Sequence, residues 1–254
     1  MKKLFSIMLL LATVLSFTAC GSDNDEPDDV KLSKSSYTLY HEGTAVIQGS
    51  NISNLIWNAD NEFVATVKNN VITANYVGRT VVKSSSKNLS FTVEVKPKYS
   101  LYKEPDLDWA ATKTSIKKKY GTPYKENSSG FMYETSNSKV PYMVILFDGE
   151  KVSSYTMVCQ ISSAEELADF LLERYAPVQA DEANLSAVFI HGYGKVNNLR
   201  IDYMVGMQYN STVKGITVSY VKYNGSKSIS ADDMNFGSTF KDVEAMTSNI
   251  SVLR

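Results

Sequence analysis

Short runs of alternating apolar and polar residues fill the chain from residue 31 to residue 97. Alternation of this kind, separated by turn-forming residues, is typical of strands that bury one face, and no part of this stretch has helical spacing. The pattern predicts a small antiparallel β-sandwich, with Asn69-Asn70 as a tight hairpin turn. The predicted strands contain Tyr37–Leu39, Ala45–Ile47, Leu55–Trp57, Val64–Val67, Val71–Ala74, Thr80–Val82 and Leu89–Val95.

The pattern changes after Pro97, and residues 98–254 are predicted to form an α+β domain with an antiparallel sheet. Residues 106–120 carry apolar side chains at helical spacing, and Gly121-Thr122-Pro123 then ends the predicted helix. Three strands follow, with Asp148-Gly149 as the hairpin turn between the second and the third. These strands are predicted at 130–134, 141–147 and 151–161.

A second helix-plus-three-strand unit is predicted after the first. Ser162 and Glu165 have the spacing of a capping box, so a helix is expected to begin at Ser162. Tyr120-Gly121-Thr122-Pro123 is echoed by Tyr175-Ala176-Pro177, which suggests an internal duplication. Further strands and a last helix are predicted at 185–191, 198–205, 213–221 and 238–248.

The first twenty residues are predicted to direct export and lipid attachment. Lys2 and Lys3 precede Leu4–Phe17, an apolar stretch of about 14 residues, which is shorter than the roughly 20 needed to span a bilayer and suits a signal peptide. The ending Phe17-Thr18-Ala19-Cys20 resembles the lipobox of bacterial lipoproteins. The resemblance implies that residues 1–19 are a signal peptide and that Cys20 is the lipidation site.

An acidic tether, residues 20–30, comes next. Its carboxylates repel one another and it has little apolar area to bury, so a flexible segment is expected. The run from Asp23 to Asp29 resembles the export signal that sends Bacteroidota-type lipoproteins to the outer face of the outer membrane. The resemblance implies a protein that is lipid-anchored in the outer membrane and faces the cell exterior.

Landmark residues of the first predicted domain occur in a characteristic order. They are Leu32, Tyr37, Leu39, Gly43, Trp57, Asn58–Asn61, Val64–Val67, Val71–Ala74, Gly78 and Val95. This order, over residues 31–96, resembles the bacterial immunoglobulin-like group 2 family, whose modules serve as spacers or binding domains in surface and adhesion proteins. The resemblance implies an all-β immunoglobulin-like sandwich at 31–97, with Trp57 in the core between its sheets.

A second resemblance concerns residues 115–155. Lys119–Pro123 followed by Val144–Val152 resembles the helix-plus-meander unit of small outer-membrane assembly lipoproteins and of β-lactamase inhibitor protein. The resemblance implies a meander whose helix covers one face of the sheet.

The charge balance argues against a nucleic-acid partner. The formal net charge of the chain is −1, whereas nucleic-acid binding requires a basic surface that neutralises phosphates. The dense basic run Lys117–Lys119 is interpreted as the solvated face of a helix. The expected partners are therefore the membrane, reached through the lipid, and a ligand that is not a nucleic acid.

Few residues could carry catalysis or bind a metal. The chain has 2 histidines, His41 and His191, in different predicted domains, and 2 cysteines, Cys20 and Cys159. No metal site, disulfide or cofactor is therefore predicted, and Cys159, within an apolar run, is interpreted as a buried hydrophobe. The segment from His191 to Gly194 is similar to the glycine-rich oxyanion segment of esterases, but no Gly-x-Ser-x-Gly accompanies it. No catalytic residue is assigned.

Tyrosines provide the main indication of a binding role. The chain has 16 of them, and those of the second domain, with Trp109, are expected to form an exposed face that stacks on sugars or anchors a protein. The alternative is that they cover a half-buried sheet. The tyrosines concerned are Tyr99, Tyr102, Tyr120, Tyr124, Tyr133, Tyr142, Tyr155, Tyr193, Tyr203, Tyr209, Tyr220 and Tyr223.

These patterns predict a surface-anchored lipoprotein without catalytic activity. The immunoglobulin-like domain, 31–97, is expected to hold the α+β domain, 98–254, away from the membrane, so that the second domain binds a glycan or a protein ligand. Two alternatives remain open. One is an envelope structural or assembly factor, suggested by the similarity to assembly lipoproteins, and the other is a hydrolase.

Overall fold

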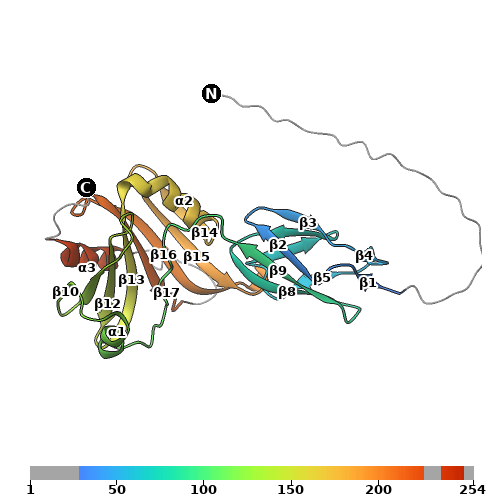
Figure 1. Ribbon diagram of the computed structural model, residues 1–254, viewed down its shortest axis with the longest axis horizontal. Coiled ribbons are helices and arrows are strands. Elements are labelled where there is room, and N and C mark those ends of the chain that lie inside the picture. The colour runs from blue at the N-terminus through green and yellow to red at the C-terminus, as the bar shows by residue number, and fades with distance from the viewer. Residues whose placement is uncertain (1–28, 226–235, 249–254) are drawn as a thin grey trace, which may run out of the picture.

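The computed structural model of the protein describes residues 29–225 and 236–248 (Figure 1). The predicted signal peptide, Cys20 and most of the acidic tether lie outside these residues. Two bodies of structure lie next to each other along the long axis, an N-terminal unit (residues 29–97) and a C-terminal unit (residues 98–225 and 236–248). Strands outweigh helices, and the sheets are mainly antiparallel.

The N-terminal unit is built from three small sheets. Their strand orders are β2-β9-β8-β5, β3-β7-β6 and β1-β4, and only the β2–β9 pairing is parallel. The strands are β1 (Lys31–Leu32), β2 (Ser36–Tyr40), β3 (Thr44–Val46), β4 (Gly49–Ser50), β5 (Trp57–Ala59), β6 (Ala65–Lys68), β7 (Val71–Ala74), β8 (Gly78–Ser84) and β9 (Ser90–Lys96). The alternation of the sequence therefore predicted the strands of this unit except the two-residue strands β1 and β4, and the expectation of purely antiparallel pairing was wrong for β2 and β9.

Trp57 lies in the core of the N-terminal unit, as predicted. Its side chain is buried and packs edge-on against Phe91, with ring centroids 5.3 Å apart. The indole nitrogen donates a hydrogen bond of 2.9 Å to the Asn70 side chain. Asn69 and Asn70 have positive φ angles of 51° and 59°, which confirms the predicted tight turn between β6 and β7.

The C-terminal unit is organised around one eight-stranded antiparallel sheet. Its strand order is β10-β11-β12-β13-β17-β16-β15-β14. The last strand of the first half, β13, therefore pairs with the last strand of the second half, β17, in the middle of the sheet. The strands are β10 (Lys125–Glu126), β11 (Gly130–Glu134), β12 (Tyr142–Asp148), β13 (Lys151–Gln160), β14 (Ala176–Asp181), β15 (Ser186–Tyr193), β16 (Arg200–Asn210) and β17 (Gly215–Lys222).

Helices cover both faces of this sheet. The first face carries α1 (Lys113–Tyr120) and α2 (Ala164–Leu172), whose Ile116, Leu167 and Phe170 belong to the largest core. The opposite face carries α3 (Gly237–Thr247), which buries Val243 and Met246. None of the helices within the described ranges has the length and apolarity needed to cross a membrane.

Several predicted boundaries were wrong. The helix predicted from residue 106 begins at Lys113, and its capping box is formed by Thr112 and Ser115. The capping box predicted at Ser162 and Glu165 does not form, because a 3₁₀ turn (Ile161–Ser163) precedes α2 and Ser163 is the N-cap without a side-chain hydrogen bond. The predicted hairpin turn at Asp148-Gly149 is confirmed.

Each half of the sheet has four strands, not the predicted three. The unpredicted strands β10 and β14 are the two edges of the sheet. The side chains of β14 are mostly exposed, and Pro177 lies within it. An edge strand with little burial has no need to alternate apolar and polar residues, so residues 176–181 carry no recognisable strand pattern.

Candidate functional site

The two units meet through hydrogen bonds between segments far apart in the sequence. After β15, the Gly194 N–H donates to the Asn61 side chain (3.0 Å), and the Gly194 carbonyl accepts from the Glu62 N–H (2.7 Å). The Glu62 carboxylate accepts from the Val196 N–H (2.7 Å) and pairs with Lys195 (3.4 Å). These main-chain and side-chain bonds dock the β15–β16 connection onto the N-terminal unit.

Glu173, at the end of α2, bonds to both units. Its carboxylate accepts hydrogen bonds from the N–H groups of Lys98 (2.8 Å) and Tyr99 (3.1 Å) in the connecting segment. Its carbonyl accepts from the Val77 N–H of the N-terminal unit (2.8 Å). Only 2% of Glu173 is exposed, so this residue holds the connection between the units from a buried position.

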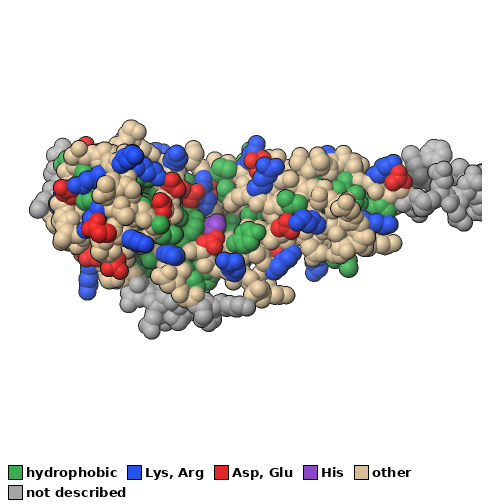
Figure 2. All heavy atoms as spheres, turned by 90° about the horizontal axis from the view of Figure 1, so that it is seen from below, with side chains coloured by type: hydrophobic (Ala, Val, Ile, Leu, Met, Phe, Trp, Pro, Cys, Tyr) green, Lys and Arg blue, Asp and Glu red, His purple; other side chains and the backbone are tan. Residues whose placement is uncertain are grey.

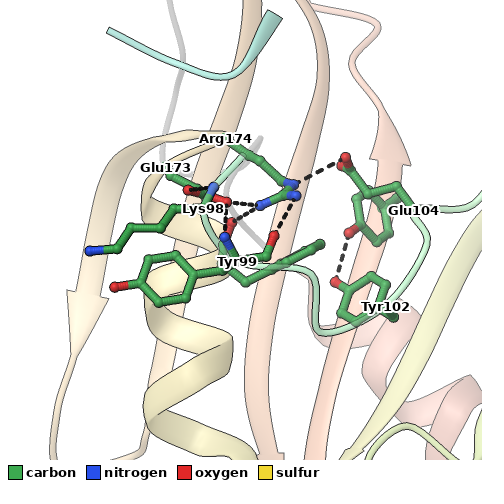
Figure 3. Close-up of polar contacts among 8 residues, drawn as sticks. Lys98, Tyr99, Tyr102, Glu104, Glu173 and Arg174 are labelled. Carbon is green, nitrogen blue, oxygen red and sulfur yellow. Dashed lines mark hydrogen bonds and ion pairs between the residues drawn. The ribbon is translucent and has the colours of Figure 1, made fainter. Parts of the chain in front are cut away.

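Arg174 neutralises the buried Glu173 carboxylate, and the two residues are called the junction clamp below. Figure 3 shows the guanidinium between Glu173 and Glu104. It also donates to the carbonyls of Tyr99 (2.9 Å) and Phe170 (3.0 Å), and only 8% of Arg174 is exposed. Burial raises the pKa of Glu104, and the nearby Arg174 opposes that rise. The clamp leaves Arg174 few donors for any other partner.

A cavity of about 280 Å³ opens beside the clamp, where the two units meet, and is called the junction cleft. The turn after β2 supplies His41 and Glu42, with Glu42 at a positive φ of 63°. The other lining residues are Tyr40 at the end of β2, Lys98 and Tyr99 in the connecting segment, and Asp169, Leu172 and Glu173 of α2 and its end.

The chemistry of the cleft is mixed aromatic and polar. Tyr40 is 56% exposed and Leu172 is 41% exposed, which leaves apolar area open to a ligand. The Lys98 ammonium and the Tyr99 hydroxyl point away from Arg174 (Figure 3). Carboxylates of Glu42 and Asp169 add acceptors to the lining. The cleft can therefore offer ring faces for stacking together with donors and acceptors for hydrogen bonds.

His191 contacts a carboxylate but does not form a catalytic triad. Its Nδ1–H donates to Asp202 (3.2 Å), and its ring stacks on Tyr203 with centroids 4.7 Å apart. Burial lowers the pKa of His191, and the Asp202 carboxylate opposes this. Within residues 29–225 and 236–248, no Ser or Thr hydroxyl bonds to the imidazole.

The structure brings the two histidines, which lie in different units, into one row of rings. His41 stacks on Tyr76 (5.6 Å between centroids), Tyr76 on Phe63 (4.4 Å), and Phe63 packs against His191 (5.2 Å). The row crosses the junction, and Figure 2 shows a histidine among hydrophobic side chains where the two units meet.

In the part of the chain that the structure describes, no three His, Cys, Asp or Glu side chains are arranged to hold a metal ion.

The contacts of Cys159 and of the basic run Lys117–Lys119 indicate structural roles for these residues. Cys159 is fully buried, and burial raises the pKa of its thiol to about 12, which makes the thiolate scarce at neutral pH. Lys117 and Lys119 are exposed and pair with Glu126 and Asp106, both at 2.6 Å. Figure 2 likewise shows positive and negative side chains mixed over one face of the molecule.

The predicted tyrosine face spanning both halves of the sheet was wrong. Of the predicted tyrosines, all of which lie in the described residues, only Tyr124 and Tyr193 are exposed, and they lie beside β10 and at the end of β15, far apart in the strand order. Tyr102, Tyr155 and Tyr220 are buried, with the Tyr102 and Tyr220 hydroxyls 2.7 Å apart. The second sheet face is also covered by α3, which the expectation of an open face did not allow for.

Comparison with known proteins adds no assignment. No family model matches the chain, and no curated protein is significantly similar to it. The candidate site therefore depends on the geometry of the junction cleft alone.

Proposed function

We propose that this protein is a lipid-anchored surface protein that binds a glycan in the junction cleft, without catalysing a reaction. The observation that carries the proposal is the cleft itself, in which the partly exposed rings of Tyr40 and Tyr99 lie beside Lys98, Glu42 and Asp169. Sugar rings stack their C–H faces on aromatic rings and present hydroxyls to charged acceptors and donors, so this combination suits a saccharide.

A glycan is favoured over a protein partner by the size and character of the cleft. A protein interface of standard size buries about 800 Å² on each partner around large apolar anchors. The cleft is only about 280 Å³ in volume, and its one aliphatic lining residue is Leu172. One or a few sugar units match such a space better than a protein surface does.

The domain arrangement supports the anchoring part of the proposal. The proposed lipid on Cys20 would be followed by the tether and then by β1, which lies at the end of the N-terminal unit remote from the C-terminal unit (Figure 1). An immunoglobulin-like spacer in that position would hold the cleft away from the membrane. A duplicated C-terminal domain is also part of the proposal, supported by a helix followed by four strands in each half of the sheet.

The second candidate function, an envelope structural or assembly factor, is supported by the buried junction clamp. A rod of two firmly joined units could also act as a strut. Protease treatment of intact cells separates the two: degradation supports an outward-facing binder, whereas complete protection supports an inward-facing assembly role.

The binding proposal is tested with the purified lipoprotein in detergent on a glycan array. Tyr40→Ala should reduce binding at least tenfold, because it removes an exposed stacking surface without opening a core. Tyr124→Ala is the matched control, since Tyr124 is 59% exposed but lies beside β10, away from the cleft. The proposal fails if no glycan binds or if both variants bind like the unaltered protein.

A further inference from the structure

Two carboxylates of the junction cleft have no lysine or arginine partner among the described residues. Glu42 has a single ionic contact, at 3.9 Å from the His41 ring, and 86% of its side chain is exposed. Asp169 forms no side-chain hydrogen bond or ion pair with any of the residues described in the structure. Both groups are therefore available to a ligand.

The basic residues of the cleft do not offset these carboxylates. Arg174 is taken up by Glu173, Glu104 and two carbonyls, so the clamp is close to neutral within itself. Lys98 contributes the remaining ammonium, which lies 5.5 Å from the centre of the Tyr99 ring. The groups left for a ligand are thus two carboxylates and one ammonium, together with the His41 imidazole, which lies 3.9 Å from the Glu42 carboxylate.

From this imbalance we infer that the cleft selects neutral and amino saccharides and rejects acidic ones, with Asp169 and Glu42 as the residues that determine specificity. The inference rests on the proposed glycan binding and names its ligand class. Carboxylates accept charge-assisted hydrogen bonds from sugar hydroxyls and from protonated amino groups. A uronate or sulfate ester would bring a further negative charge beside them, and like charges at short range repel strongly in a partly desolvated cleft.

The test uses an array on which glucose-, galactose- and mannose-based oligosaccharides are each printed in three forms: neutral, 2-amino and 6-carboxylate. The lipoprotein in detergent should bind neutral or amino forms at least tenfold better than the carboxylate form of the same sugar. Asp169→Asn combined with Glu42→Gln should reduce this ratio to less than threefold. High salt should also reduce it, because salt screens charge repulsion but leaves stacking intact.

A matched variant keeps this test separate from the test of binding itself. Tyr40→Ala should weaken the neutral and carboxylate forms in equal proportion and leave their ratio unchanged. The selectivity inference is overturned if carboxylate forms bind as well as neutral forms, or if the double variant keeps the original ratio. If no form binds, the proposed function fails first, and the selectivity inference fails with it.

Discussion

Breaking the junction clamp should destabilise the protein far more than breaking an exposed ion pair on the same helix. Replacing Arg174 by Met would leave the Glu173 carboxylate, 2% exposed, without its counter-charge. Losing one partner of a buried pair costs about 3–5 kcal/mol, and the two N–H donors that remain on Glu173 favour the lower end of that range. For a chain of this size about 3 kcal/mol corresponds to a fall in Tm of roughly 6–12 °C.

Two further variants make this prediction specific. Lys139→Met breaks the 2.6 Å pair with Glu166 on α2, whose side chains are 54% and 36% exposed, so it should cost less than about 1 kcal/mol. Combining Arg174→Met with Glu173→Gln should recover part of the lost stability, because the Glu173 charge, the more deeply buried of the two carboxylates that Arg174 contacts, is then removed. Denaturant unfolding of the full chain measures all three. The reasoning is refuted if Arg174→Met costs no more than Lys139→Met, or if the double variant loses the sum of both single losses.

Three other predictions concern the core, the junction and the anchor. Trp57→Ala should cost about 3–5 kcal/mol of unfolding free energy and Trp57→Phe about 1–2, since Phe keeps most of the apolar area but loses the bond to Asn70. Because burial lowers the pKa of His191, this side chain binds a proton in the unfolded chain at a higher pH than in the folded chain. Acid therefore favours unfolding: the contribution of His191 to stability is full above pH 6.5 and falls as the pH drops below it. Denaturant unfolding at pH 7.5 and 5.5 should therefore show a smaller acid loss in His191→Gln than in the unaltered protein, and an equal or larger loss would contradict this. Cys20→Ser should move the protein from the membrane fraction to the soluble fraction and abolish fatty-acid labelling, whereas a labelled mutant in the membrane pellet would refute lipidation at Cys20.

Local patterns predicted most strands but not the edges of the sheet. Strands such as β11 and β13 bury most of their side chains, so their apolar content is visible in the sequence. The edge strand β14 buries almost none and left no such signal. The second face of the sheet is covered because α3 packs against it. The position of α3 on the sheet cannot be deduced from the amphipathic spacing of the helix alone.

The junction cleft was not predicted, because its walls come from three distant segments that only the tertiary structure brings together. The sequence nevertheless contained one indication of the junction. Arg174 follows Leu167 by seven positions and Phe170 by four, so it continues the apolar stripe of α2. A charged residue on a buried stripe requires a partner, and the adjacent Glu173 was the available one. This pair could have indicated a buried ionic junction, although not which segments it would join.

The clamp and the cleft depend on the same short segment of chain. Glu173 accepts hydrogen bonds from the N–H groups of Lys98 and Tyr99, and these two residues also line the cleft. The positions of both side chains thus depend on a buried carboxylate that a ligand does not need to touch. Since small displacements of stacking and hydrogen-bonding groups weaken recognition, loss of the clamp should reduce glycan affinity even at temperatures where the protein stays folded. If Arg174→Met binds glycan like the unaltered protein while losing stability, the cleft is positioned by the contacts of Gly194 and Glu62 instead.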